Sequence, residues 1–172
     1  LETARKVQQI GKRLRGNRVR VHVSIGTFIP KPHTAFQWAS SEDPDSIQEK
    51  INFLREGMRQ SKIKLSYNRP DSTLLEAWLS RGDRRLGKVI EQAWQSGAKF
   101  DAWDEGFQKD YWYKAFDVSG ITPEFYTQRK RETDEVFPWD HISSGVSKDF
   151  LLEEYEMSQR GETRSDCRGG CH

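Results

Sequence analysis

The spacing of apolar residues changes repeatedly along the first third of the chain, and each spacing predicts a different element. Over residues 1–15 apolar side chains recur every three or four positions, which predicts an amphipathic helix. Over residues 19–25 Val and Ile alternate with Arg, His and Ser, which is the period of a half-buried strand. Residues 43–60 and 63–67 repeat this order, with a second helix followed by a second strand. The pattern therefore indicates an α/β fold.

Beyond the second strand the apolar spacing is helical, so we expect the fold to be mainly helical. The predicted elements are helices over 70–79, 86–95 and 101–119, a short helix within 120–128, and a last helix over 147–160. Pro70 and Ser147 stand where two of these helices begin, as N-terminal residue preferences favour. The polar residues that follow position 160 are expected to form a loose tail.

A loop that contains two prolines follows the first predicted strand. Pro30 and Pro32 flank Lys31 and exclude both a helix and a central strand over residues 26–38. Loops that leave the carboxyl ends of strands carry ligands in α/β proteins, and this loop offers His33, backbone carbonyls and aromatic rings. The alternative is a rigid connector whose aromatic residues pack on the core. We favour the ligand-binding interpretation because the loop follows a strand directly.

The composition is polar for a compact domain, but aromatic residues compensate. Of 172 residues 34% are hydrophobic and 31% charged, while six Trp, nine Phe and five Tyr can bury large areas. The net charge of +2 is unevenly spread, because residues 1–20 carry seven Lys or Arg and one acid. This basic segment is suited either to RNA phosphates or to the solvated face of a helix, and we favour the solvated face.

The residues taken alone predict no complete active site. The segment 80–85 brings Arg81, Arg84 and Arg85 together with Asp83, and we favour a structural ion-pair hub there over a substrate site. The sequence has no glycine-rich phosphate loop, no HExxH pair and no Ser, Cys or Thr in a recognised nucleophile context.

Both cysteines lie close to the carboxyl end of the chain, at Cys167 and Cys171, with His172 directly after them. Two thiols at this spacing suit a metal ion or an iron–sulfur cluster, although such sites usually have four ligands. Incidental thiols and a disulfide are the alternatives. Because we find no signal peptide and no apolar run long enough to span a membrane, we expect a cytoplasmic protein. The abrupt start and end lead us to expect a piece of a longer protein.

Four stretches, which together extend over nearly the whole chain, carry a family resemblance. They are Val21-His22-Val23-Ser24 leading into Phe28-Ile29-Pro30-Lys31-Pro32-His33-Thr34-Ala35-Phe36-Gln37-Trp38; Leu79-Ser80-Arg81-Gly82-Asp83-Arg84-Arg85-Leu86; Ala98-Lys99-Phe100-Asp101-Ala102-Trp103; and Gly161 to Arg168. In this order they resemble the C-terminal part of a radical SAM family, the large uncharacterised proteins with an N-terminal cobalamin-binding-like domain. The resemblance implies that residues 1–60 end a partial β/α barrel, that residues 61–160 form a mainly helical extension, and that residues 161–172 form a flexible tail.

The same resemblance implies the cofactor sites. Phe28, Ile29 and Pro30, with His33, would contact S-adenosylmethionine, and the two tail cysteines would begin an auxiliary cysteine cluster. The three cysteines that hold the catalytic [4Fe–4S] cluster are absent here, as is any cobalamin-binding segment. The chain is therefore expected to act with the rest of its parent enzyme and to be inactive alone.

Two other roles stay open at this point. One is a non-catalytic RNA-binding module that uses the basic N-terminal helix together with Arg81, Arg84 and Arg85. The other is a purely structural extension that closes the barrel.

Overall fold

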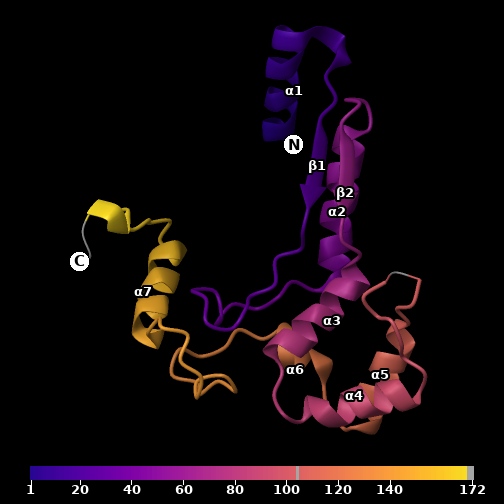
Figure 1. Ribbon diagram of the computed structural model, residues 1–172, viewed down its shortest axis with the longest axis vertical. Coiled ribbons are helices and arrows are strands. Elements are labelled where there is room, and N and C mark those ends of the chain that lie inside the picture. Colours follow the sequence, from indigo (N-terminus) through magenta and orange to yellow (C-terminus); the bar gives the residue numbers. More distant parts are fainter. Residues whose placement is uncertain (104, 170–172) are drawn as a thin grey trace.

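The computed structural model describes residues 1–103 and 105–169. Its elements are α1 (Glu2–Arg15), η1 (Gly16–Arg18), β1 (His22–Ile25), α2 (Pro44–Met58), β2 (Lys64–Tyr67), α3 (Pro70–Arg81), α4 (Leu86–Gln95), α5 (Lys109–Val118), α6 (Pro123–Thr127), α7 (Lys148–Gln159) and η2 (Cys167–Gly169). The chain is thus a mainly helical α/β protein, as its apolar spacing predicts. Figure 1 shows an arm built from α1, β1, β2 and α2, a body built from α3 to α6, and α7 set to one side.

The arm is a β–α–β unit with a parallel pair of strands. β1 and β2 pair in register, with His22 opposite Lys64. Because side chains alternate along a strand, Val23 points to one face of the sheet and His22 to the other. The apolar face packs against both helices through a cluster centred on Ala4 of α1 and Met58 of α2. The opposite face is polar and carries His22 and Ser66, whose Nε2 and Oγ atoms lie 2.9 Å apart.

The body has its own aromatic core between α3, α4 and α5. The ring of Trp78 meets that of Phe116 edge to face, with the centroids 4.9 Å apart. Val89 and Ala93 of α4 are buried against this pair of helices. Burying rings of this size accounts for a compact core in a chain whose overall composition is polar.

A second aromatic cluster joins the long loop after β1 to the C-terminal segment. Trp38 from that loop is fully buried and packs with Phe137, Trp139, Leu151 and Tyr155. Segments about a hundred residues apart in sequence are therefore fixed side by side. In Figure 1 the loop runs from β1 toward the body and α7 and then returns to α2.

One predicted helix is shorter than its sequence suggests. The segment before Lys109 folds as a set of tight turns, in which the amide groups of Gly106 and Phe107 both donate to the carbonyl of Trp103. Phe100 has a φ of 58°, outside the helical region. A Cβ atom on Gly106 would lie 2.6 Å from the carbonyl oxygen of Phe100, so this close approach requires a glycine. The prediction of one helix over residues 101–119 is wrong for residues 101–103 and 105–108.

Candidate functional site

The segment between β1 and α2, residues 26–43, holds all four residues predicted to contact a cofactor, and we call it the β1–α2 loop. It leaves the carboxyl end of a parallel strand, which is where α/β proteins place their ligand sites. Its backbone is tied to the body and to the C-terminal segment by a network of buried hydrogen bonds.

Arg81, at the end of α3, is the centre of that network. Its side chain is 0% exposed and donates from Nη1 to the carbonyl of Pro30 at 3.0 Å, from Nη2 to that of Ala39 at 2.9 Å and from Nε to that of Tyr126 at 3.0 Å. Burial, together with the nearby charge of Arg131, lowers the pKa of Arg81 to about 10, still well above neutrality. A charged guanidinium therefore links both ends of the loop to α6.

This result refines the prediction for the segment 80–85. Arg81 is structural, but its acceptors are backbone carbonyls rather than carboxylates. The ion pair in the segment is instead formed by Arg85 and Asp83, with Nη2 and Oδ2 2.7 Å apart. The hydrogen bonds from Arg85 hold the pKa of Asp83 below its usual range, although burial acts in the opposite direction.

Two further backbone bonds fix the second half of the loop. The amide of Arg131 donates to the carbonyl of Trp38 at 2.9 Å, and the amide of Ser41 donates to that of Thr127 at 2.6 Å. The loop is therefore held in place by the protein itself, which is the arrangement expected of a preorganised binding segment. It also fits the alternative of a rigid connector.

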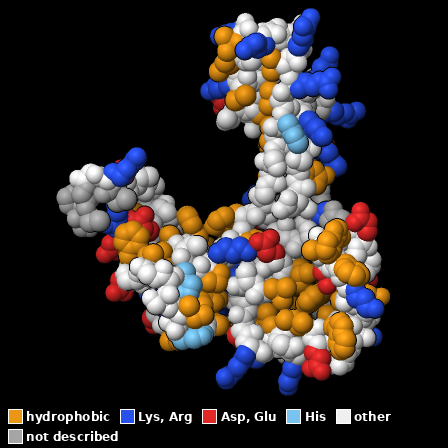
Figure 2. Space-filling model, viewed as in Figure 1, with side chains coloured by type: hydrophobic (Ala, Val, Ile, Leu, Met, Phe, Trp, Pro, Cys, Tyr) orange, Lys and Arg blue, Asp and Glu red, His pale blue; other side chains and the backbone are white. Residues whose placement is uncertain are grey.

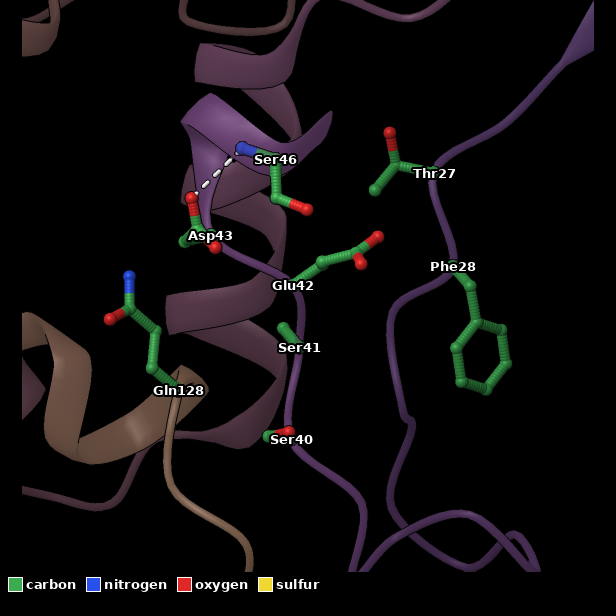
Figure 3. A pocket seen from close by; sticks show the side chains of 8 residues that line it. All are labelled: Thr27, Phe28, Ser40, Ser41, Glu42, Asp43, Ser46 and Gln128. Atoms are coloured by element: carbon green, nitrogen blue, oxygen red, sulfur yellow. Dashed lines mark hydrogen bonds between the residues drawn. The ribbon is translucent and has the colours of Figure 1, made fainter. Parts of the chain in front are cut away.

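A pocket of about 550 Å³ opens between the two ends of the loop. Figure 3 shows Thr27 and Phe28 on one side, with Ser40 to Asp43 on the other. Ser46, in the first turn of α2, and Gln128, just after α6, complete the lining. The Phe28 ring is 60% exposed and meets the ring of Phe36 edge to face, so it offers an aromatic surface to a ligand.

The acidic side chains of the pocket have internal partners. Oδ1 of Asp43 accepts from the amide of Ser46 at 2.9 Å and caps α2. Glu42 is paired with Lys50 in the second turn of α2. The uncharged hydroxyl groups and the Phe28 ring are thus the groups best suited to a polar ligand with an aromatic ring.

The four predicted cofactor residues do not share one pocket. Phe28 lines the pocket just described, whereas Ile29 and Pro30 are buried and pack inside the loop. His33 lies in a different hollow, of about 360 Å³, together with Gln37 and Asp140. The geometry brings only Phe28 to the pocket at the end of β1.

His33 nevertheless has an unusual backbone, with a φ of 54°. Its amide donates to Oε1 of Gln37 at 3.3 Å, and the same oxygen accepts from Nε1 of Trp139 at 2.9 Å. Asp140, across the hollow, pairs with Lys148 at 2.7 Å. His33 thus stands at the contact between the loop and the C-terminal segment.

Sequence reasoning did not identify Ser40, Ser41, Glu42 or Gln128 as members of a site. They face Phe28 only because the loop reverses direction and α6 docks beside it. One feature of the sequence points to this part of the site. Asp43 is a residue type that favours a helix start, so it places the beginning of α2 shortly after the loop that leaves β1.

The predicted metal ligands fall at the limit of what the structure describes. Cys167 begins η2, and Cys171 lies outside the described residues. Over residues 1–103 and 105–169 no group of three or more His, Cys, Asp or Glu side chains could hold a metal ion. The segment before η2 is anchored to α7, because Arg164 pairs with Glu153 at 2.9 Å and with Glu154 at 2.5 Å.

Within the same described part, no helix has both the length and the apolar composition needed to cross a bilayer.

Comparison with known proteins finds a distant relative. No protein-family model matches the chain, and no solved structure matches it. Over 102 residues the chain is 26% identical to Uncharacterized protein MJ0966 of Methanocaldococcus jannaschii. The matched segment covers 59% of this chain and 22% of that protein. The chain is therefore similar to part of a much longer archaeal protein.

Proposed function

We propose that this chain is the C-terminal part of a radical SAM iron–sulfur enzyme, in which α1, β1 and α2, with β2 paired to β1, end a partial β/α barrel. The observation that carries the proposal is the parallel β1–α2–β2 unit, whose helices pack on one face only. Parallel sheets occur almost only in larger assemblies with both faces covered. Among the described residues each strand pairs with one neighbour, so further strands are needed to complete the sheet.

In the proposed enzyme the catalytic cluster is held by cysteines of the parent chain, because this sequence lacks the three-cysteine motif. The chemistry supplied by the bound cluster is reductive cleavage of S-adenosylmethionine to a 5′-deoxyadenosyl radical, with methyl transfer as one outcome if cobalamin is also bound. Phe28 would pack on the adenosyl group, and the hydroxyl groups of Ser40 and Thr27 would hydrogen-bond its polar edge. The hydrogen bonds from Arg81 to the carbonyls of Pro30 and Ala39 would hold these pocket residues in position.

The test uses the longer protein, produced without oxygen and with its cluster reconstituted. We expect 5′-deoxyadenosine when S-adenosylmethionine and dithionite are added, and none from the 172-residue chain alone. Phe28→Ala should weaken S-adenosylmethionine binding by about tenfold, because it removes an aromatic contact of roughly 1–1.5 kcal/mol. Phe100→Ala, at another exposed aromatic residue, in the body, is the control.

Two results would overturn the proposal. One is a longer protein without clustered cysteines upstream of this region. The other is a protein with an intact cluster that forms no 5′-deoxyadenosine. The proposal also places the enzyme in the cytoplasm, with the rest of the parent chain as its partner and an unidentified substrate, for which RNA is one candidate.

A second candidate function is RNA binding by the arm. Figure 2 shows Lys and Arg side chains gathered over the arm, which favours an electrostatic contact with nucleic acid. Arg81 cannot take part, because its guanidinium is buried and each of its three nitrogens donates to a backbone carbonyl. The apolar residues Val7, Ile10 and Leu14 are exposed on α1, and this stripe favours a protein partner over RNA.

A gel-shift titration with tRNA at several salt concentrations tests this second candidate. If it holds, Lys12→Ala with Arg13→Ala should lower the slope of log affinity against log salt by about two. The matched control is Lys88→Ala with Lys114→Ala, two exposed lysines of the body. Equal effects of both pairs, or no shift at low salt, would count against an RNA site on the arm.

A further inference from the structure

A second pocket, of about 590 Å³, lies between the α3–α4 junction and the segment that precedes α7. We call it the arginine pocket. Its lining residues are Asp83, Arg84, Arg85, Val136, Phe137, Pro138 and His141. It shares no lining residue with the pocket at the end of β1.

Buried positive charge lies next to this pocket. Arg131 is 2% exposed, and its guanidinium lies over the rings of Phe137 and Trp139, 5.3 and 5.0 Å from their centroids. Its Nη2 donates to the carbonyl of Arg81 at 2.9 Å, while its buried Nε atom has no hydrogen-bond partner among the described residues. Arg81 itself binds carbonyls only. The guanidinium of Arg131 is therefore separated from the pocket by the ring of Phe137 and has no carboxylate in contact, and Arg81 behind it has none either.

The carboxylates nearby are already engaged. Asp83 is occupied by Arg85, and Glu135 forms a two-pronged pair with Arg129 at 2.6 and 2.7 Å. These pairs leave the charges of the two buried arginines uncompensated by direct contact. Because charges act over longer distances in a poorly solvated interior, the pocket is a favourable place for an anion.

One guanidinium is free to contact that anion. Arg84 lines the pocket and is exposed, and over the described residues it makes no ion pair or hydrogen bond through its side chain. An arginine fork matches phosphate oxygens two at a time. Beside it, the side chains of Val136 and Pro138 are exposed and apolar, and they offer a surface to an uncharged group.

From this arrangement we infer that the arginine pocket binds a small molecule in which a phosphate is joined to an apolar group. Arg84 takes the phosphate, and the wall formed by Val136 and Pro138 takes the apolar part. His141, at the same rim, adds a further hydrogen-bond donor to the phosphate oxygens.

Calorimetric titration of the full 172-residue chain tests this inference with two probes, inorganic phosphate and phenyl phosphate. We expect both to bind, and phenyl phosphate to bind about tenfold more tightly because its ring is removed from water. Arg84→Ala should weaken both probes by at least about tenfold, since it removes a charge-assisted pair. Arg13→Ala, at an exposed arginine of α1, is the matched control and should leave both affinities unchanged.

A third variant separates the two halves of the site. Val136→Ser should reduce the preference for phenyl phosphate and leave the affinity for inorganic phosphate unchanged. Arg84 and Val136 are exposed, so both variants are expected to fold, and circular dichroism checks this. The inference is overturned if neither probe binds at millimolar concentration, or if Arg13→Ala weakens binding as much as Arg84→Ala. It is also overturned if the two probes bind equally well.

Discussion

The β1–α2 loop lies within the stretch of sequence that builds the arm, yet the loop and the arm differ in how they contact the rest of the protein. The loop is anchored by Arg81, which binds the carbonyls of Pro30 and Ala39, and its aromatic side chains pack against the C-terminal segment. The arm instead leaves a polar sheet face and an apolar stripe on α1 in contact with solvent. The loop is thus a finished part of the structure, whereas the arm presents surfaces that a further part of a larger protein would cover.

The largest effect is expected when the side chain that anchors the loop is removed. Arg81→Met keeps much of the volume of the side chain but removes the donor to the carbonyls of Pro30 and Ala39, and it leaves that of Tyr126 with only the 3.5 Å bond from Nη2 of Arg131. We expect a loss of roughly 3–5 kcal/mol in the free energy of unfolding, measured by urea denaturation. Arg13→Met, on the exposed face of α1, should change it by less than about 0.5 kcal/mol. Similar losses for both variants would mean that Arg81 does not hold the loop.

The role of Arg81 also shows how far the sequence can predict this molecule. Helix and strand positions follow from local periodicity, and the predicted spans for α2, α4 and α7 differ from the observed ones by a few residues at most. The partners of Arg81 are backbone carbonyls 42 to 51 residues away, and every residue has a carbonyl. No residue pattern can mark such acceptors.

The same limit explains the errors at the candidate site. Periodicity extends α5 toward Asp101, but Trp112 donates to Oδ1 of Asp101 at 3.4 Å, and Gly106 lies against the carbonyl of Phe100. These contacts stabilise a turn that local propensity does not encode. For the loop, proline spacing predicts an irregular segment after β1, but it cannot tell that Phe28 faces the pocket while Ile29 faces the interior.

A smaller effect is expected from the pair that Arg129 and Glu135 form beside the arginine pocket. The hydrogen bonds from Arg129 lower the pKa of Glu135, although burial acts in the opposite direction. A carboxyl group whose pKa is lowered by folding stabilises the protein above its ordinary pKa, and this contribution is lost as the pH falls through the folded value. Glu135→Gln should therefore cost about 1 kcal/mol at pH 7 and progressively less below pH 4.5, as measured by urea denaturation across pH.

Glu162→Gln is the control for that measurement, because Glu162 pairs with Arg160 at the exposed end of α7. Its stability should follow the unaltered chain at every pH. If Glu135→Gln shows the same loss at pH 3 as at pH 7, the pair is not the source of the pH dependence.

The smallest change in the free energy of unfolding is expected for a substitution on the arm, where the altered side chain is exposed. Leu14 is 76% exposed on α1, so Leu14→Ser should change the free energy of unfolding of this chain by no more than about 0.5 kcal/mol. If the stripe is covered by another segment of a longer protein, the same substitution there should cost roughly 1–3 kcal/mol, because it then removes a buried side chain. Lys12→Ser, at a neighbouring polar position, should be neutral in both proteins. Equal costs of Leu14→Ser in the short and the long protein would show that the stripe stays exposed, and the arm would then be as complete as the loop.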